Sequence, residues 1–211
     1  MRAVRPRKLG LPRDRLLLVV TGALAARNSP SLVETIRGWY PELTVRVLVT
    51  ENALRFATRS LLEVTSRERV LGPDWDEGHD LPVPHRELAE WADAVLVYPA
   101  SGNTVARLAA GIGDSLALTT VNDALCPVII VPGVSPGFGR RKIHHDNIRR
   151  LRESEYVVMD TVLGRSASDG SMNPTAPPPC ADIMMAIGKA VRQSAENALR
   201  SEPEAHLKGV S

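Results

Sequence analysis

Five short apolar runs are spread along the chain, and each ends at a turn of small or polar residues. They cover residues 16–20, 45–49, 94–98, 127–132 and 156–159. Continuous apolar runs of this length are typical of strands that are buried on both faces of a parallel sheet. The sequence therefore predicts an α/β fold, a single-domain, Rossmann-like, doubly wound parallel sheet flanked by helices.

The stretches between these runs have helical patterns, and Ser29-Pro30 is a clear helix start. We expect helices over residues 29–39, 51–62, 85–91, 103–110, 140–152 and 181–199. Residues 1–14 are expected to form a flexible arm, 15–200 the domain and 201–211 a polar tail. Residues 164–179 are rich in Gly, Ser, Asp and Pro, which predicts a mobile substrate flap, with a plain loop as the alternative.

Composition excludes several classes of partner. The 211 residues carry 26 basic and 24 acidic side chains, a net charge of +2, which gives no electrostatic argument for nucleic acid or an anionic membrane. No apolar run approaches the ~18 residues needed to span a bilayer. Cys126 and Cys180 are too few for a disulfide framework or a thiolate zinc site, so we expect a cytoplasmic protein. We expect no metal site at His144 and His145 either, because adjacent side chains diverge on a helix, and both are expected on a solvated helix face.

The turns after the apolar runs hold the candidate ligand groups. In a parallel sheet, ligands bind beyond the carboxyl ends of the strands, where these turns lie. The turns are Thr21 to Ala23, Thr50 to Asn52, Pro99 to Thr104 and Pro132 to Gly137. Neither GxGxxG nor GxxxxGK[ST] is present, so the common dinucleotide and P-loop sites are excluded. The hydroxyls, carboxamide and backbone amides predict a cradle for one phosphate and a polar ring system.

A longer pattern surrounds the third apolar run. His85-Arg86-Glu87-Leu88 and Trp91-Ala92-Asp93 precede it, and Pro99-Ala100-Ser101-Gly102-Asn103-Thr104 comes directly after it. Together with Thr50 to Phe56 and Cys126 to Pro132, these motifs resemble the FMN-dependent cysteine decarboxylase family of flavoproteins. Members include phosphopantothenoylcysteine decarboxylase and the decarboxylases that process C-terminal cysteines of ribosomal peptides. The resemblance covers about residues 15–160.

The resemblance implies an FMN cofactor and a set of residues that contact it. These are Gly22, Ala23, Thr50, Phe56, Ser101, Asn103, Thr104 and Gly133. Their hydroxyls and carboxamide suit the phosphate or the edge of the isoalloxazine. Thr21-Gly22 and Thr50 also have a simpler interpretation, as residues that only form the turn between a strand and the next helix.

The same resemblance assigns His85 as the active-site base, since an imidazole can accept a proton near neutral pH. The implied reaction oxidises the cysteine side chain to a thioaldehyde, which then loses CO2 and leaves an enethiol. The alternative for His85 is a helix-start residue after Pro84 with no chemical role.

The family's P-x-M-N-x-x-M-W segment is altered in this chain, which bears on the substrate. Ser135 stands in place of Asn, Phe138 in place of Met and Gly139 in place of Trp, and Ser168 stands where the coenzyme A enzyme has a reducing Cys. Ser135, Phe138 and Ser168 are the expected substrate-binding residues. Without a reducing thiol the reaction is expected to stop at the enethiol, so we favour a precursor peptide with a C-terminal cysteine and formation of aminovinyl-cysteine. The alternatives are phosphopantothenoylcysteine or a non-catalytic binding subunit.

Assembly is also implied by the resemblance. Family members form trimers or dodecamers with FMN at the subunit contact, so we expect a homo-oligomer. A basic cluster has two interpretations. It binds an acidic leader peptide or a neighbouring subunit, or it is simply a solvated helix face. It comprises Arg140, Arg141, Lys142, Arg149, Arg150 and Arg152.

Overall fold

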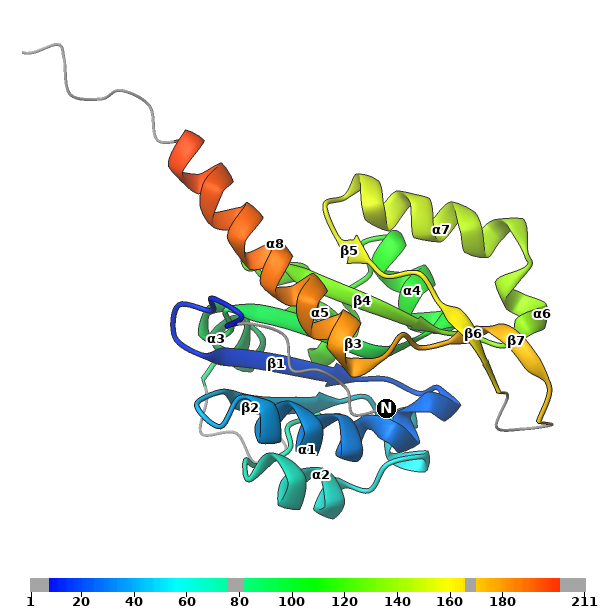
Figure 1. Ribbon diagram of the computed structural model, residues 1–211, viewed down its shortest axis with the longest axis horizontal. Coiled ribbons are helices and arrows are strands. Elements are labelled where there is room, and N and C mark those ends of the chain that lie inside the picture. The colour runs from blue at the N-terminus through cyan, green and yellow to red at the C-terminus, as the bar shows by residue number, and fades with distance from the viewer. Residues whose placement is uncertain (1–7, 76–81, 166–169, 202–211) are drawn as a thin grey trace, which may run out of the picture.

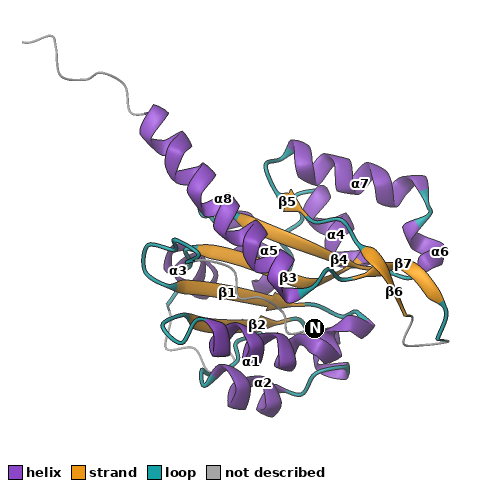
Figure 2. Ribbon diagram, viewed as in Figure 1, coloured by secondary structure: helices purple, strands orange, loops and turns teal. Residues whose placement is uncertain are grey.

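The computed structural model describes residues 8–75, 82–165 and 170–201. A five-stranded sheet in the order β2-β1-β3-β4-β5 forms its centre, and every pairing in it is parallel. Helices cover both faces of this sheet (Figures 1 and 2). This confirms the predicted Rossmann-like, doubly wound α/β fold.

The strands match the predicted apolar runs closely. Their bounds are β1 Arg15–Val20, β2 Thr44–Val49, β3 Ala94–Ser101, β4 Val128–Gly133 and β5 Val157–Val158. Alternate side chains of one strand point to opposite faces, so Leu18 belongs to one half of the core and Leu17 to the other. Both are fully buried, as expected for strands covered on both faces.

Two layers of helices cover the sheet. Helices α1 (Ser29–Trp39), α2 (Arg59–Ser66) and α8 (Cys180–Ser201) pack on the Leu18 side. The other side carries α3 (Pro84–Trp91), α4 (Gly102–Ala109), α5 (Leu116–Asp123) and α7 (Lys142–Glu153). Shorter helices in the described residues are the 3-10 helices η1 (Leu24–Asn28) and η2 (Glu51–Arg55), and α6 (Pro136–Gly139). Among the described residues, none of the helices is long and apolar enough to cross a membrane.

Several predicted elements differ from the structure. The helix expected over 51–62 is two pieces, η2 and α2, because Thr58 is extended and its hydroxyl accepts a hydrogen bond from Leu61 N, which starts a new helix. Helices α5 and α6 were not predicted. His144, expected on a solvated face, is only 7% exposed, since the inward stripe of α7 runs through His144, Asn147 and Leu151.

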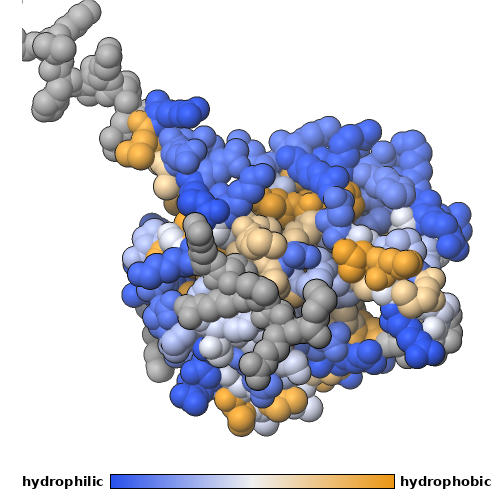
Figure 3. Space-filling view, viewed as in Figure 1, coloured by the Kyte–Doolittle hydropathy of each residue, from blue (hydrophilic) through white to orange (hydrophobic). Residues whose placement is uncertain are grey.

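The expected substrate flap is a β-hairpin. Strands β6 (Val162–Arg165) and β7 (Met172–Ala176) pair antiparallel at one end of the molecule. Val162, Leu163 and Met172 are exposed on it, and Figure 3 shows an apolar patch over this hairpin. Whether the hairpin moves is still a prediction, and Ser168 lies outside the described residues.

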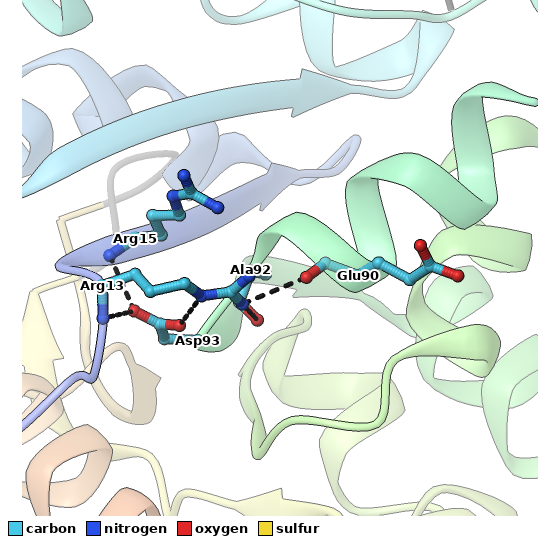
Figure 4. A network of polar contacts seen from close by, with 5 residues as sticks. All are labelled: Arg13, Arg15, Glu90, Ala92 and Asp93. Atoms are coloured by element: carbon cyan, nitrogen blue, oxygen red, sulfur yellow. Dashed lines mark hydrogen bonds and ion pairs between the residues drawn. The ribbon is translucent and has the colours of Figure 1, made fainter. Parts of the chain in front are cut away.

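The N-terminal segment is held against the domain from residue 8 onward. Leu9 and Leu11 are buried in the core, so this part of the predicted flexible arm is anchored. Figure 4 shows how Asp93 holds the start of β1: its carboxylate accepts hydrogen bonds from Arg13 N (2.7 Å), Arg13 Nε (2.8 Å) and Arg15 N (3.1 Å). The acid of the Trp-Ala-Asp motif therefore ties β1 to β3 and lies at the amino ends of the strands.

Candidate active site

A cavity of about 580 Å³ lies beyond the carboxyl ends of β1, β3 and β4. It sits where the strand order reverses between β1 and β3, the usual place for a ligand in an open α/β sheet. Its lining comes from the turns after these three strands, from η1 and α6, and from the β6–β7 hairpin.

The first wall is the turn after β1, which is held close to β3 by the buried Thr21. The Thr21 hydroxyl donates to Pro99 O (2.6 Å) and accepts from Ser101 N (2.8 Å). Gly22, the next residue, packs so closely on the loop after β2 that a Cβ atom there would lie 2.4 Å from Asn52 Cβ. Only glycine allows this approach. The Thr21 hydroxyl therefore ties the first wall to β3, and Gly22 lets the same wall pack on the loop after β2.

The second wall is the start of α4. Ser101 is its N-cap: the hydroxyl accepts from Thr104 N (3.2 Å) and shares a hydrogen bond with Thr104 Oγ1 (2.9 Å). The first amides of α4, on Gly102 and Asn103, face no backbone acceptor within the helix, and both residues line the cavity. Asn103 Oδ1 accepts from Arg107 Nε (3.2 Å), which leaves the amide NH2 of Asn103 as a donor. This wall is suited to an anion or to a carbonyl oxygen.

The third wall is the turn after β4 and the short helix α6. Ser135 caps α6, because its hydroxyl accepts from Phe138 N (3.4 Å). The ring of Phe138 lies against Gly102, where a Cβ atom would be 2.8 Å from Cε1. Gly102 and Phe138 are thus in contact, and the absence of a Cβ atom at Gly102 makes room for the aromatic ring.

Seven of the predicted site residues line this cavity: Gly22, Ala23, Ser101, Asn103, Gly133, Ser135 and Phe138. Thr50, Phe56 and Thr104 do not; Thr104 is 6% exposed and its hydroxyl serves the N-cap of α4. The sequence reasoning missed Arg27 and Asn28 on η1 and Asn173 and Thr175 on the hairpin. No motif marked them, since they join the cavity only through the folding of the hairpin and of η1 against the strand ends.

His85 lies apart from the cavity lining, at the start of α3. Its Nε2 atom is 3.5 Å from Asp123 Oδ2, and its ring meets Trp75 edge-on at 5.4 Å between centroids. Its Nδ1 atom is buried and has no hydrogen-bond partner in the described part of the chain. The geometry gives His85 an oriented imidazole with an acid beside it, but it does not bring that imidazole into the cavity of the same chain.

A model of the protein family described as Flavoprotein matches residues 5–192. The chain belongs to the Flavoprotein family. This confirms the predicted resemblance, and it agrees with the expected class of cofactor, a flavin.

Curated relatives of this flavoprotein include coenzyme A biosynthesis proteins. The coenzyme A biosynthesis bifunctional protein CoaBC of Mycobacterium tuberculosis is 34% identical over 152 residues, which are 72% of this chain and 35% of the relative. The protein of the same name from Bacillus subtilis is 32% identical over 154 residues, 73% of this chain and 37% of the relative. The chain thus spans about a third of the length of the curated relatives it matches.

Solved structures similar to this flavoprotein include an FMN-dependent cysteine decarboxylase, an FMN binding protein and a PPC decarboxylase. The FMN-dependent cysteine decarboxylase SpaF has a TM-score of 0.73 and 25% identity, over 88% of this chain and 99% of that one. The FMN binding protein AtHal3 has a TM-score of 0.68 and 26% identity, over 88% and 98%. A PPC decarboxylase variant complexed with pantothenoylaminoethenethiol, at 24% identity and a TM-score of 0.73, has the same fold over 86% and 98%.

The cavity of this flavoprotein fits a flavin in size and donors. Its volume, about 580 Å³, lies within the range of cofactor sites, which is ~300–1,000 Å³. The start of α4 offers amides to a phosphate, Arg27 adds a positive charge, and Gly22 and Ala23 leave room for a ring. In the described residues no cluster of His, Cys, Asp and Glu is arranged to hold a metal ion.

Neither cysteine takes part in this site. Cys126 and Cys180 are both partly buried and unpaired, and neither lines the cavity. Burial raises the pKa of each thiol to about 11, so both are protonated near neutral pH. They are therefore poor nucleophiles in the folded protein.

Proposed function

We propose that this protein is an FMN-dependent decarboxylase that removes the carboxylate of a cysteine residue in its substrate. The cavity at the switch point between β1 and β3 carries the proposal, because it combines a flavin-sized space with the Ser101–Asn103 turn. Family membership and the FMN-dependent cysteine decarboxylases among the solved relatives support it.

In this proposal the protein binds and orients, and the flavin accepts two electrons from the substrate. The amides at the start of α4 and the side chain of Arg27 hold the phosphate. The NH2 group of Asn103 donates to a polar edge of the ring or to the substrate carboxylate. The hairpin covers the opposite side and keeps water from the reacting carbon.

The base of this reaction is His85 of a neighbouring copy. The expectation of a homo-oligomer with FMN at the subunit contact, and the position of His85 outside its own cavity lining, together support this arrangement. The Asp123 carboxylate lies 3.5 Å from Nε2 and fixes the orientation of the His85 ring. Trimer and dodecamer are both compatible with the proposal.

Two substrates remain, and the comparisons favour the one that the sequence reasoning ranked second. The curated relatives support phosphopantothenoylcysteine better than a peptide. A peptide with a C-terminal cysteine is the second candidate, since Ser135 stands where the family has Asn and the exposed apolar side chains of the hairpin suit an extended chain. No cysteine lines the cavity in the described residues, so with either substrate the product is the enethiol.

Reconstitution with FMN and subsequent turnover test the proposal. The protein loaded with FMN is incubated with phosphopantothenoylcysteine and, separately, with a peptide ending in cysteine, and the products are identified by mass spectrometry. We expect one substrate to lose two hydrogens and CO2. A protein that cannot be loaded with FMN, or that leaves both substrates unchanged, contradicts the proposal.

A further inference from the structure

A second cavity of about 370 Å³ adjoins the flavin-sized one, and we call it the distal cavity. Val134, Pro136 and Thr175 line both cavities, so the turn after β4, the start of α6 and strand β7 lie between them. Its far side is formed by α7 and by residues 159–161, which link β5 to β6. A molecule that fills the first cavity therefore lies beside this space.

Positive charge exceeds negative charge in the distal cavity. The two arginines Arg140 and Arg152 line it together with a single acid, Asp160. Arg152 is already neutralised, because its Nη2 atom lies 2.7 Å from Asp160 Oδ1 and also donates to Val158 O. Arg140 has neither a hydrogen bond nor an ion pair within the described residues, so its guanidinium is free to bind an anion that enters the cavity.

A buried polar group in the same wall also lacks a partner. His144 is 7% exposed and lines the distal cavity, and its Nδ1 atom forms no hydrogen bond with the described residues. A buried polar atom without a partner is costly, which favours a ligand or water that completes its hydrogen bonding. Burial and the neighbouring His145 both lower the pKa of His144, so near neutral pH it serves as a neutral hydrogen-bonding group.

Apolar side chains also line the distal cavity. Ile148, Met159 and Pro174 contribute carbon surface to the same cavity as Arg140 and Arg152. This lining suits a substrate arm that carries both aliphatic carbon and an anion.

We propose that the distal cavity is an anion subsite of the active site, in which Arg140 binds a carboxylate or phosphate on the part of the substrate remote from the decarboxylated cysteine. The assignment rests on the proposed function, since it names a further part of the same substrate. The anion is either the phosphate of phosphopantothenoylcysteine or an acidic side chain of a peptide.

Two matched substrate pairs separate these sources. The first pair is phosphopantothenoylcysteine and pantothenoylcysteine. The second pair consists of two peptides that end in cysteine. One has Glu at each of the three preceding positions, and the other has Gln there. Arg140→Gln is expected to affect the pair that belongs to the true substrate class. Within that pair, kcat/KM for the charged member should fall about tenfold more than kcat/KM for the neutral member. The control is Arg150→Gln, an equal loss of charge on an exposed residue of α7 outside both cavities. Equal losses for the charged and neutral members of both pairs would overturn the proposal.

Anion binding is also measured without turnover. Inorganic phosphate is titrated into the FMN-loaded protein by calorimetry, so that the flavin already occupies its own phosphate site. We expect Arg140→Gln to weaken phosphate binding about tenfold and Arg150→Gln to leave it unchanged. If no substrate is turned over but this difference is present, the decarboxylase proposal fails and the anion site stands. Phosphate affinity that does not depend on Arg140 refutes the anion site.

Discussion

Replacement of Gly102 by Ala tests whether the contact between Gly102 and Phe138 shapes the flavin cavity. The new Cβ atom would lie 2.8 Å from Phe138 Cε1 and 3.1 Å from Cδ1. Carbon atoms in contact prefer ~3.5–4.0 Å, so the ring must withdraw by roughly 1 Å. Phe138 sits on the short helix α6 and is half-buried, which lets the ring move at moderate cost.

The expected loss of stability results from two opposed effects. Overpacking costs about 1–3 kcal/mol, and exchange of Gly for Ala in a helix returns about 0.5–1 kcal/mol. A net loss of about 1 kcal/mol lowers the melting temperature by roughly 2–4 °C in a domain of this size. Because the displaced ring lines the cavity, we also expect FMN to bind roughly fivefold more weakly.

A second substitution and a control make this prediction refutable. Phe138→Met replaces the rigid ring with a narrower, flexible side chain that can turn away from the new methyl group. The Gly102→Ala/Phe138→Met double variant is therefore expected to recover stability and flavin affinity, with a coupling energy of about 1 kcal/mol. Gly137→Ala is the matched control, since no atom lies within 4 Å of its added Cβ. Scanning fluorimetry and flavin titration measure both quantities. Strictly additive effects would show that the ring and the glycine are not coupled.

Three other predictions concern His85, Asp93 and the two cysteines. Mixed oligomers of His85→Asn and Asn103→Ala are expected to regain activity that neither variant has alone, because one subunit supplies the base and its neighbour the intact cavity. Turnover after co-refolding measures this, and mixed oligomers without activity would refute a base supplied by a neighbouring copy. Asp93→Asn leaves three donors with a poorer acceptor and is expected to cost about 2–4 kcal/mol in denaturant unfolding, with flavin affinity unchanged; a loss below ~0.5 kcal/mol would contradict the structural role of Asp93. Burial raises the pKa of Cys126 and Cys180 to about 11, and an unfolded thiol titrates at ~8.5, so above that pH the unfolded chain binds fewer protons. The free energy of unfolding is therefore expected to fall as pH rises towards 11, and a double Cys→Ala variant to show a smaller decline.

The sheet was predictable because its signal is local. Each buried strand is a run of consecutive apolar residues, and the turn after it must lie at the carboxyl edge whatever the rest of the chain does. Gly22, Ser101 and Gly133 reach the cavity for this reason alone. The strand order sets their place in the lining. Strands that alternate with helices allow only a few strand orders.

Elements defined by distant contacts were harder to predict. The residues of the β6–β7 hairpin have no strong strand pattern, since Gly, Pro and Asn interrupt both strands, and the hairpin forms by pairing across a turn. His144 was misplaced for a related reason. The surrounding stretch 140–152 is rich in charged residues, and the apolar residue beside it, Ile143, is exposed. Only the packing of α7 on the domain decides which side of that helix is buried.

The position of His85 concerns the assembly of the active site. The proposed base and the flavin cavity of the same chain do not lie together. A motif can mark His85 as a base and the Ser101 turn as a flavin cradle, but a motif does not say whether both belong to one active site. In the structure the cradle faces the carboxyl edge of the sheet, whereas His85 is held by Asp123 of α5 and by Trp75. An oriented imidazole that is absent from the cavity of its own chain favours a shared site. In such a site the assembly of subunits is itself part of catalysis, and dilution into monomers should abolish turnover before it unfolds the protein.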